Sequence, residues 1–161
     1  MKRPPTSALE QLLGWFLVVV MGTSVVNVLW QVFTRFVLSN PSSYTEELAR
    51  YLLIWIGLIG AAYASGRRMH LAIDLLPRVL SGRAHIALQI TIRVIIALFA
   101  VGVLTYGGFQ LVRLTLTLGQ TSSALRIPMG WVYAALPISG VLIAWFSVRD
   151  IMGHLKGRDP T

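Results

Sequence analysis

Cysteine is absent from the 161 residues of this chain, and charged side chains make up only 12% of them. Without thiols the chain cannot form disulfides, bind metals through thiolates or act as a thiol-oxidising membrane enzyme. Soluble domains carry roughly 25% charged residues, so this composition lies well outside that class. With 55% hydrophobic residues and a mean hydropathy of +0.69, the sequence indicates a membrane protein.

The apolar stretches also lack the groups on which membrane-embedded chemistry usually depends. None has an acidic residue at its centre, so the usual proton- or cation-coupling site is missing. His70, His85 and His154 are expected on loops or tails, which leaves no facing pair to hold a haem. No phosphate loop, metal motif or nucleophile elbow occurs. The sequence predicts neither an enzyme nor a cofactor-binding or metal-binding protein.

Four long apolar stretches fill most of the chain. A helix rises about 1.5 Å per residue, so roughly 20 apolar residues cross the ~30 Å hydrocarbon core of a bilayer. The alternating pattern of barrel strands is absent. We expect one all-α membrane domain, residues 1–161, with an uncleaved first span. Its four transmembrane helices are predicted at about 12–34, 46–66, 88–113 and 127–149.

The basic residues predict the orientation. Of the fourteen lysines and arginines, only Arg35, Arg50, Arg113 and Arg126 lie on one side of the predicted spans. The other ten lie on the side of the termini, and basic residues concentrate in the cytoplasm. We expect both termini to be cytoplasmic. This topology explains the net charge of +8. We expect no binding to nucleic acid, because no soluble module is present to carry it.

The start of the second span carries a cluster of charges. Ser43 followed by Glu46 predicts a capping box. Glu46 and Glu47 lie four and three residues before Arg50, so all three can meet on one helix face. The apolar part, 51–66, spans only about 24 Å, which would pull these charges toward the hydrocarbon edge. The cluster is either a solvated helix start or a set of ions that faces a partner.

Small residues recur in the same span at helical spacing. Gly57, Gly60, Ala61 and Ala64 share one face. Lipid gives no hydrophobic drive for helix association, so close packing of small residues has to replace it. The face packs either against this chain's own helices or against another subunit.

Other polar residues have structural interpretations. Asn27 and Gln31 are predicted to hydrogen-bond a neighbouring helix. Arg93 and Arg113 bracket the third span, and we expect each to extend toward a membrane surface. Residues 70–81 predict a helix lying in the interface, with an apolar face and a polar face. The polar residues noted in this inner loop are His70, Asp74 and Arg78.

The sequence resembles the small membrane subunit, or small permease, of tripartite ATP-independent periplasmic (TRAP) transporters, of the dicarboxylate type. The similarity is strongest over residues 44–55 and continues through 60–64. Further matching positions are Arg67, Arg68, His70, Ile73, Asp74, Ile127, Pro128, Trp131, Tyr133 and Pro137.

This resemblance implies a scaffold subunit that forms a heterodimer with a large permease subunit in the bacterial inner membrane. The large subunit would carry sodium and an organic acid, which a periplasmic substrate-binding protein delivers. The predicted partner interface comprises Glu46, Glu47, Arg50, Gly57, Gly60, Ala61 and Ala64. The predicted docking residues for the binding protein are Arg35, Glu46, Glu47 and Arg126. Membrane lipids are the remaining expected partners.

Two other classes remain as alternatives. A self-sufficient four-helix exporter would need a membrane-embedded acidic residue, and none lies within 12–34. An anchor subunit of a redox complex would need facing histidines or a quinone pocket.

Overall fold

The computed structural model describes residues 7–39, 42–67 and 83–155, and this part of the chain is almost entirely helical. Its helices are α1 (Ala8–Phe36), α2 (Ser43–Gly66), α3 (Arg83–Phe99), the π-helix η1 (Ala100–Gly107), α4 (Gly108–Thr117), α5 (Met129–Tyr133) and α6 (Ala135–Leu155). Four stretches here are long and apolar enough to cross a membrane, at Ala8–Phe36, Ser43–Gly66, Ile90–Thr117 and Met129–Met152. The all-α class with four spans is therefore confirmed. The predicted interfacial helix at 70–81 lies outside the described residues.

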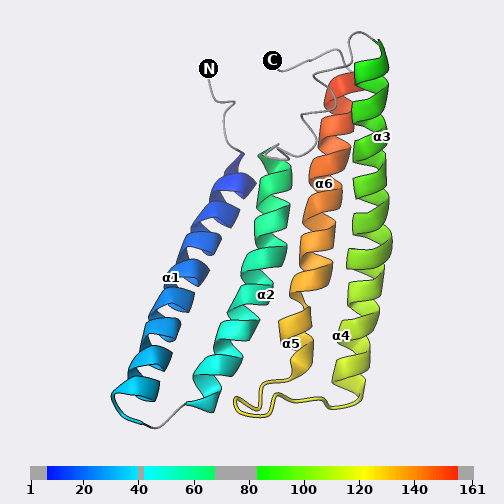
Figure 1. Ribbon diagram of the computed structural model, residues 1–161. Helices are drawn as coiled ribbons and strands as arrows, with labels where there is room; N and C mark the ends of the chain where they lie inside the picture. The colour runs from blue at the N-terminus through cyan, green and yellow to red at the C-terminus, as the bar shows by residue number, and fades with distance from the viewer. Residues whose placement is uncertain (1–6, 40–41, 68–82, 156–161) are drawn as a thin grey trace.

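The four spans stand side by side in one layer (Figure 1). In this layer α1 packs on α2, α2 packs on α6, and α6 packs on α3 and η1. The first turn of α1 and the last turns of α2 and α6 lie at one end, which we name the network end. The opposite end, with the loop 118–128, is the loop end. The arginine bias predicts that the network end is cytoplasmic.

The core is small because a layer buries few side chains. One cluster joins α1, α2 and α6 through Leu13, Ile59 and Phe146. A second contains Ala62, Ala100 and Ile143, from α2, η1 and α6. The fourth span is the most enclosed, with 39% of its apolar window buried against 6% for the third span. The fourth span is therefore the centre of the fold.

A glycine sets the closest helix contact. A Cβ atom at Gly140 would lie 2.5 Å from the Thr105 hydroxyl oxygen and 2.8 Å from the Ala100 carbonyl oxygen. The Thr105 hydroxyl donates to that carbonyl, five residues back, at 2.9 Å. Gly140 thus lets α6 touch the backbone of η1. No pattern in the sequence predicted this π-helix.

The fourth span is interrupted at Ala134, because Pro137 has no N–H to donate to the carbonyl of Tyr133. Two local expectations were wrong. The capping box does not form: Ser42, one residue earlier than expected, is the N-cap of α2 and makes no side-chain capping bond. His85 and His154 were expected on loops or tails, but they lie within α3 and α6.

Candidate functional site

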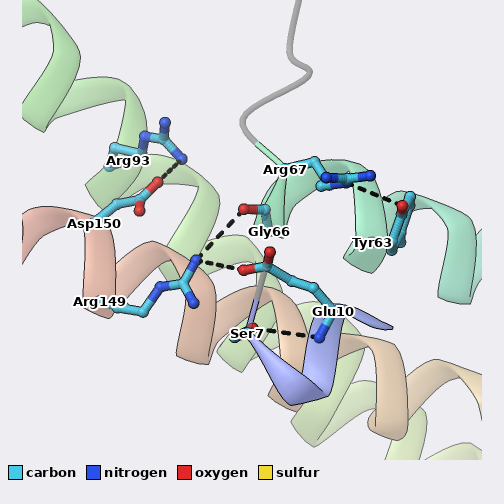
Figure 2. A network of polar contacts seen from close by, with 8 residues as sticks. All are labelled: Ser7, Glu10, Tyr63, Gly66, Arg67, Arg93, Arg149 and Asp150. Atoms are coloured by element: carbon cyan, nitrogen blue, oxygen red, sulfur yellow. Dashed lines mark hydrogen bonds and ion pairs between the residues drawn. The ribbon is translucent and has the colours of Figure 1, made fainter. Parts of the chain in front are cut away.

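At the network end, an ion pair joins the first span to the last. A guanidinium nitrogen of Arg149 on α6 lies 2.9 Å from a carboxylate oxygen of Glu10 on α1. The same nitrogen is 3.4 Å from the carbonyl oxygen of Gly66, at the end of α2 (Figure 2). The Ser7 hydroxyl accepts from the Glu10 N–H at 3.3 Å and caps α1. Three spans are therefore tied together through Arg149.

A second, more buried ion pair joins α3 to α6. Arg93 and Asp150 meet at 2.7 Å, with only 13% and 2% of their side chains exposed (Figure 2). We expected Arg93 to extend toward a membrane surface, which was wrong. Charged side chains within membrane-spanning helices usually face protein and pair with an opposite charge, because an isolated charge in a bilayer is costly. The pair fixes the position of the third span along the fourth.

At the loop end, the connection 118–128 is folded back on itself. Gly119, at a φ of +61°, ends α4 in a Schellman motif, in which Gln120 N–H donates to Thr115 O and Gly119 N–H donates to Leu116 O. The Ser122 N–H then bonds the Ile127 carbonyl at 2.9 Å. This short hairpin leaves the N–H groups of its tip free to point at another part of the chain.

Those tip N–H groups bind the carboxylate of Glu47. Leu125 and Ala124 donate to Oε2 at 2.8 and 2.9 Å, and Ser123 donates to Oε1 at 3.1 Å. The Ser122 hydroxyl donates to Oε2 at 3.1 Å, and the Tyr51 hydroxyl donates to Oε1 at 2.8 Å. One side chain of α2 therefore positions the whole loop before the fourth span.

The other predicted charges at the loop end are exposed. Glu46 and Arg50 form an ion pair at 3.4 Å, with 66% and 68% of their side chains exposed. Arg35 and Glu46 line one cavity between α1 and α2, whereas Arg126 stands apart in the hairpin at a φ of +53°. Of the predicted docking residues, the structure brings Arg35 and Glu46 together.

The two predicted helix-contacting polar residues behave differently. The Asn27 amide donates to the Thr45 carbonyl at 2.8 Å and is buried between α1 and α2, which confirms its prediction. Gln31 lines the cavity that contains Arg35 and Glu46.

The small-residue face of α2 is not used by this chain. A Cβ atom at Gly57 or Gly60 would meet no atom within 4 Å. Ala61 is exposed, and Ala64 is half-buried. By contrast, a Cβ atom at Gly66 on the same helix would lie 2.9 Å from the Phe146 ring. Within the described residues, Gly57 and Gly60 thus make no close contact with the chain's own helices, which favours the interpretation in which this face meets another subunit.

Residues 24–157 match the family described as tripartite ATP-independent periplasmic transporters, DctQ component. The chain belongs to this family. The sialic acid TRAP transporter small permease protein SiaQ of Vibrio cholerae is 30% identical over 132 residues, covering 79% of this chain and 72% of the relative. The chain is thus a TRAP small permease subunit, a multi-pass protein of the bacterial inner membrane. It is a transport component and not an enzyme.

Two further relatives are much longer than this DctQ-family chain. The isethionate TRAP transporter permease protein DctMQ of Oleidesulfovibrio alaskensis is 31% identical over 113 residues, covering 70% of this chain and 18% of the relative. The sialic acid TRAP transporter permease protein SiaT of Haemophilus influenzae is 28% identical over 118 residues, again covering 70% and 18%. In both, a segment similar to this chain is joined to a far longer sequence in one polypeptide.

Proposed function

We propose that this chain is the scaffold subunit of a sodium-coupled TRAP transporter. It braces a separate large permease subunit, in a one-to-one complex, during uptake of an organic acid. A periplasmic binding protein delivers that acid. The chain supplies a fixed frame in the bilayer and binds neither sodium nor substrate.

The observation that carries this proposal is the open face of α2. Gly57, Gly60, Ala61 and Ala64 lie on one side of the helix, and its buried residues, such as Ile59 and Ala62, lie on other sides. An approaching helix can reach the backbone here at no cost to the fold, since the space beside Gly57 and Gly60 is empty. In the two longer relatives, a segment similar to this chain is joined to a far longer permease sequence. This arrangement supports a large permease as the partner that occupies the face.

Glu46 and Arg50 extend this face toward the loop end. They lie four residues apart, and each has two thirds of its side chain exposed. Leu53, 67% exposed, follows three residues after Arg50 and precedes Gly57 by four. The proposed interface thus runs from an ion pair at the membrane surface to small residues inside the bilayer. Glu47 contributes indirectly, by holding the loop 118–128 beside it.

Relatives named for different substrates support a non-transporting role. The relatives named for sialic acid and for isethionate are 30% and 31% identical to this chain. Both compounds are organic acids, but they differ greatly in size. Near-equal similarity to both is expected if the small subunit does not contact the substrate.

We expect the binding protein to dock at the loop end, where Arg35 and Glu46 line one cavity, with Glu47 and Arg126 as the other predicted docking residues. Charge reversal by Glu46→Lys should reduce uptake driven by the binding protein, because complementary charges speed encounter. Unchanged uptake in Glu46→Lys, with a normal subunit complex, would exclude this docking role.

The test of the proposal is purification of the tagged chain from native membranes in mild detergent, with mass spectrometry of bound proteins. We expect stoichiometric recovery of a large polytopic permease. The variants Gly57→Leu and Ala61→Leu should fold normally and lose most of this partner. As a control, Gly22→Leu on α1 also meets open space and should retain the partner. Recovery of the wild type alone or as a homodimer would reject the scaffold role.

A further inference from the structure

A cavity of about 280 Å³, with Glu10 and Arg67 in its wall, lies between α1 and α2 at the network end. Its basic group is Arg67, whose Nε donates to the Tyr63 hydroxyl at 3.0 Å while the guanidinium lies 5.4 Å from the centre of the Tyr63 ring. These contacts hold the guanidinium in place (Figure 2). Among the described residues, no carboxylate pairs with Arg67. Within the described part of the chain, the remaining N–H groups of Arg67 are therefore open to an anion.

The acidic group in the cavity does not cancel this charge. Glu10 also lines the cavity, but its carboxylate is already paired with Arg149 at 2.9 Å. The remaining net charge is that of Arg67. Trp15 forms part of the wall and is 71% exposed, as expected for an aromatic side chain at the level of lipid head groups.

An apolar groove continues from this cavity toward the middle of the layer. It has a volume of about 420 Å³ and is lined by Leu17, Val18, Met21, Ile56 and Gly60. Val18 lines both the cavity and the groove, so the two are continuous along the seam between α1 and α2. From Glu10 to Met21 the helix rises about 16 Å, close to half of the ~30 Å hydrocarbon thickness. The combined site has the length of one membrane leaflet.

We propose that this seam is a binding site for one glycerophospholipid. The phosphate diester accepts hydrogen bonds from the Arg67 guanidinium, and one acyl chain lies in the groove over Gly60. Arginine suits this role because its fork of donors matches phosphate oxygens. A free phosphate would leave the apolar groove unfilled. A phospholipid supplies both a phosphate for Arg67 and an acyl chain for the groove.

The test is native mass spectrometry of the full chain, in its subunit complex, after purification in mild detergent. We expect one retained phospholipid on the wild-type chain. Arg67→Gln should reduce retention roughly ten-fold, because a charge-assisted contact is lost. Gly60→Leu should reduce it similarly by filling the groove, since a Cβ atom at Gly60 meets no other atom within 4 Å and the rest of the side chain can extend into the groove.

Matched controls separate this effect from damage to the fold or to the subunit contact. Arg113→Gln removes one positive charge from the third span, and Gly57→Leu adds the same side chain to α2 outside the groove. Both should retain the lipid, although Gly57→Leu should lose the large subunit. Unchanged thermal unfolding of Gly60→Leu would show that its effect is local.

Two further experiments identify the ligand. After delipidation, phosphatidylglycerol or phosphatidylethanolamine should restore binding, whereas a diacylglycerol glycolipid without phosphate should not. Millimolar inorganic phosphate or glycerol phosphate should fail to displace the lipid. The proposal is overturned if Arg67→Gln or Gly60→Leu retains the lipid, if the glycolipid binds equally well, or if free phosphate competes. A photoreactive residue at Met21 that crosslinks to the large subunit instead of lipid would also overturn it.

Discussion

Glu46 and Glu47 are adjacent in α2, yet they face different neighbours. Glu47 is bound by three N–H groups and one hydroxyl from residues 122–125, together with the Tyr51 hydroxyl of its own helix. Glu46 pairs with Arg50 on the exposed side of the helix. One carboxylate organises the chain internally, and the other is available to a partner. α2 is thus the element that connects this chain's own fold to its proposed interface.

The first prediction concerns Glu47. Glu47→Gln replaces one carboxylate oxygen by an NH₂ group. Whichever oxygen is replaced, the NH₂ group then faces at least two hydrogen-bond donors. We expect hydrogen exchange of the Ser123, Ala124 and Leu125 amides to accelerate by roughly ten-fold or more. Glu46→Gln is the control and should leave these amides unchanged. Equal protection in both variants would show that the loop holds its shape without Glu47.

The second prediction concerns the Arg93–Asp150 pair. Asp150→Asn leaves the Arg93 guanidinium buried without its counter-charge, which should cost about 3 kcal/mol of unfolding free energy. Replacing both residues together, Arg93→Met with Asp150→Leu, should recover most of that loss, because no uncompensated charge remains. Reversible unfolding in mixed micelles measures both values. A double variant less stable than Asp150→Asn would contradict the ion-pair account.

The third prediction concerns Gly140. Because Thr105 and Ala100 backbone atoms would lie 2.7 and 2.8 Å from an added Cβ, Gly140→Ala should destabilise the chain by about 1–3 kcal/mol. Gly102→Ala, in η1 itself, meets no atom within 4 Å and should be neutral or slightly stabilising. The comparison uses the same unfolding assay. Equal stability of the two variants would show that η1 and α6 do not depend on this close contact.

The fourth prediction concerns orientation, and the absence of cysteine makes it simple to test. In intact spheroplasts, a membrane-impermeant maleimide should label Ser123→Cys, at the loop end. It should label Arg158→Cys, in the C-terminal tail, only after the membrane is opened. The reverse pattern would place the network end outside and invert the topology predicted from the arginines.

Hydropathy was sufficient to predict the four spans, because the length and polarity of each helix are local properties. Local spacing also identified Asn27 as a residue that contacts a neighbouring helix. The pairing of Arg93 with Asp150 was missed, since it depends on which helices become neighbours, and hydropathy carries no such information. Four of the five donors that bind Glu47 come from a loop about 75 residues away, which no local pattern reveals. Arg149 beside Asp150 in a largely apolar helix was the one available signal of an ion-pair network.

Glycine roles were equally hard to assign from spacing. Gly57 and Gly140 both look like helix-packing residues in the sequence. Only their surroundings show that Gly140 is enclosed by η1 and that Gly57 meets open space. The sequence could therefore identify a small-residue face but left two interpretations open, and the open space beside Gly57 favours contact with another subunit.

The central claim is that the open face of α2 holds the large permease subunit, and site-specific photocrosslinking in native membranes tests it most directly. A photoreactive residue at Ala61, on this face, is compared with one at Leu98, which is 68% exposed on α3. We expect crosslinks to the large subunit from Ala61 and little or none from Leu98. Crosslinks from Leu98 with none from Ala61 would exclude the α2 face as the interface and move the interface to α3.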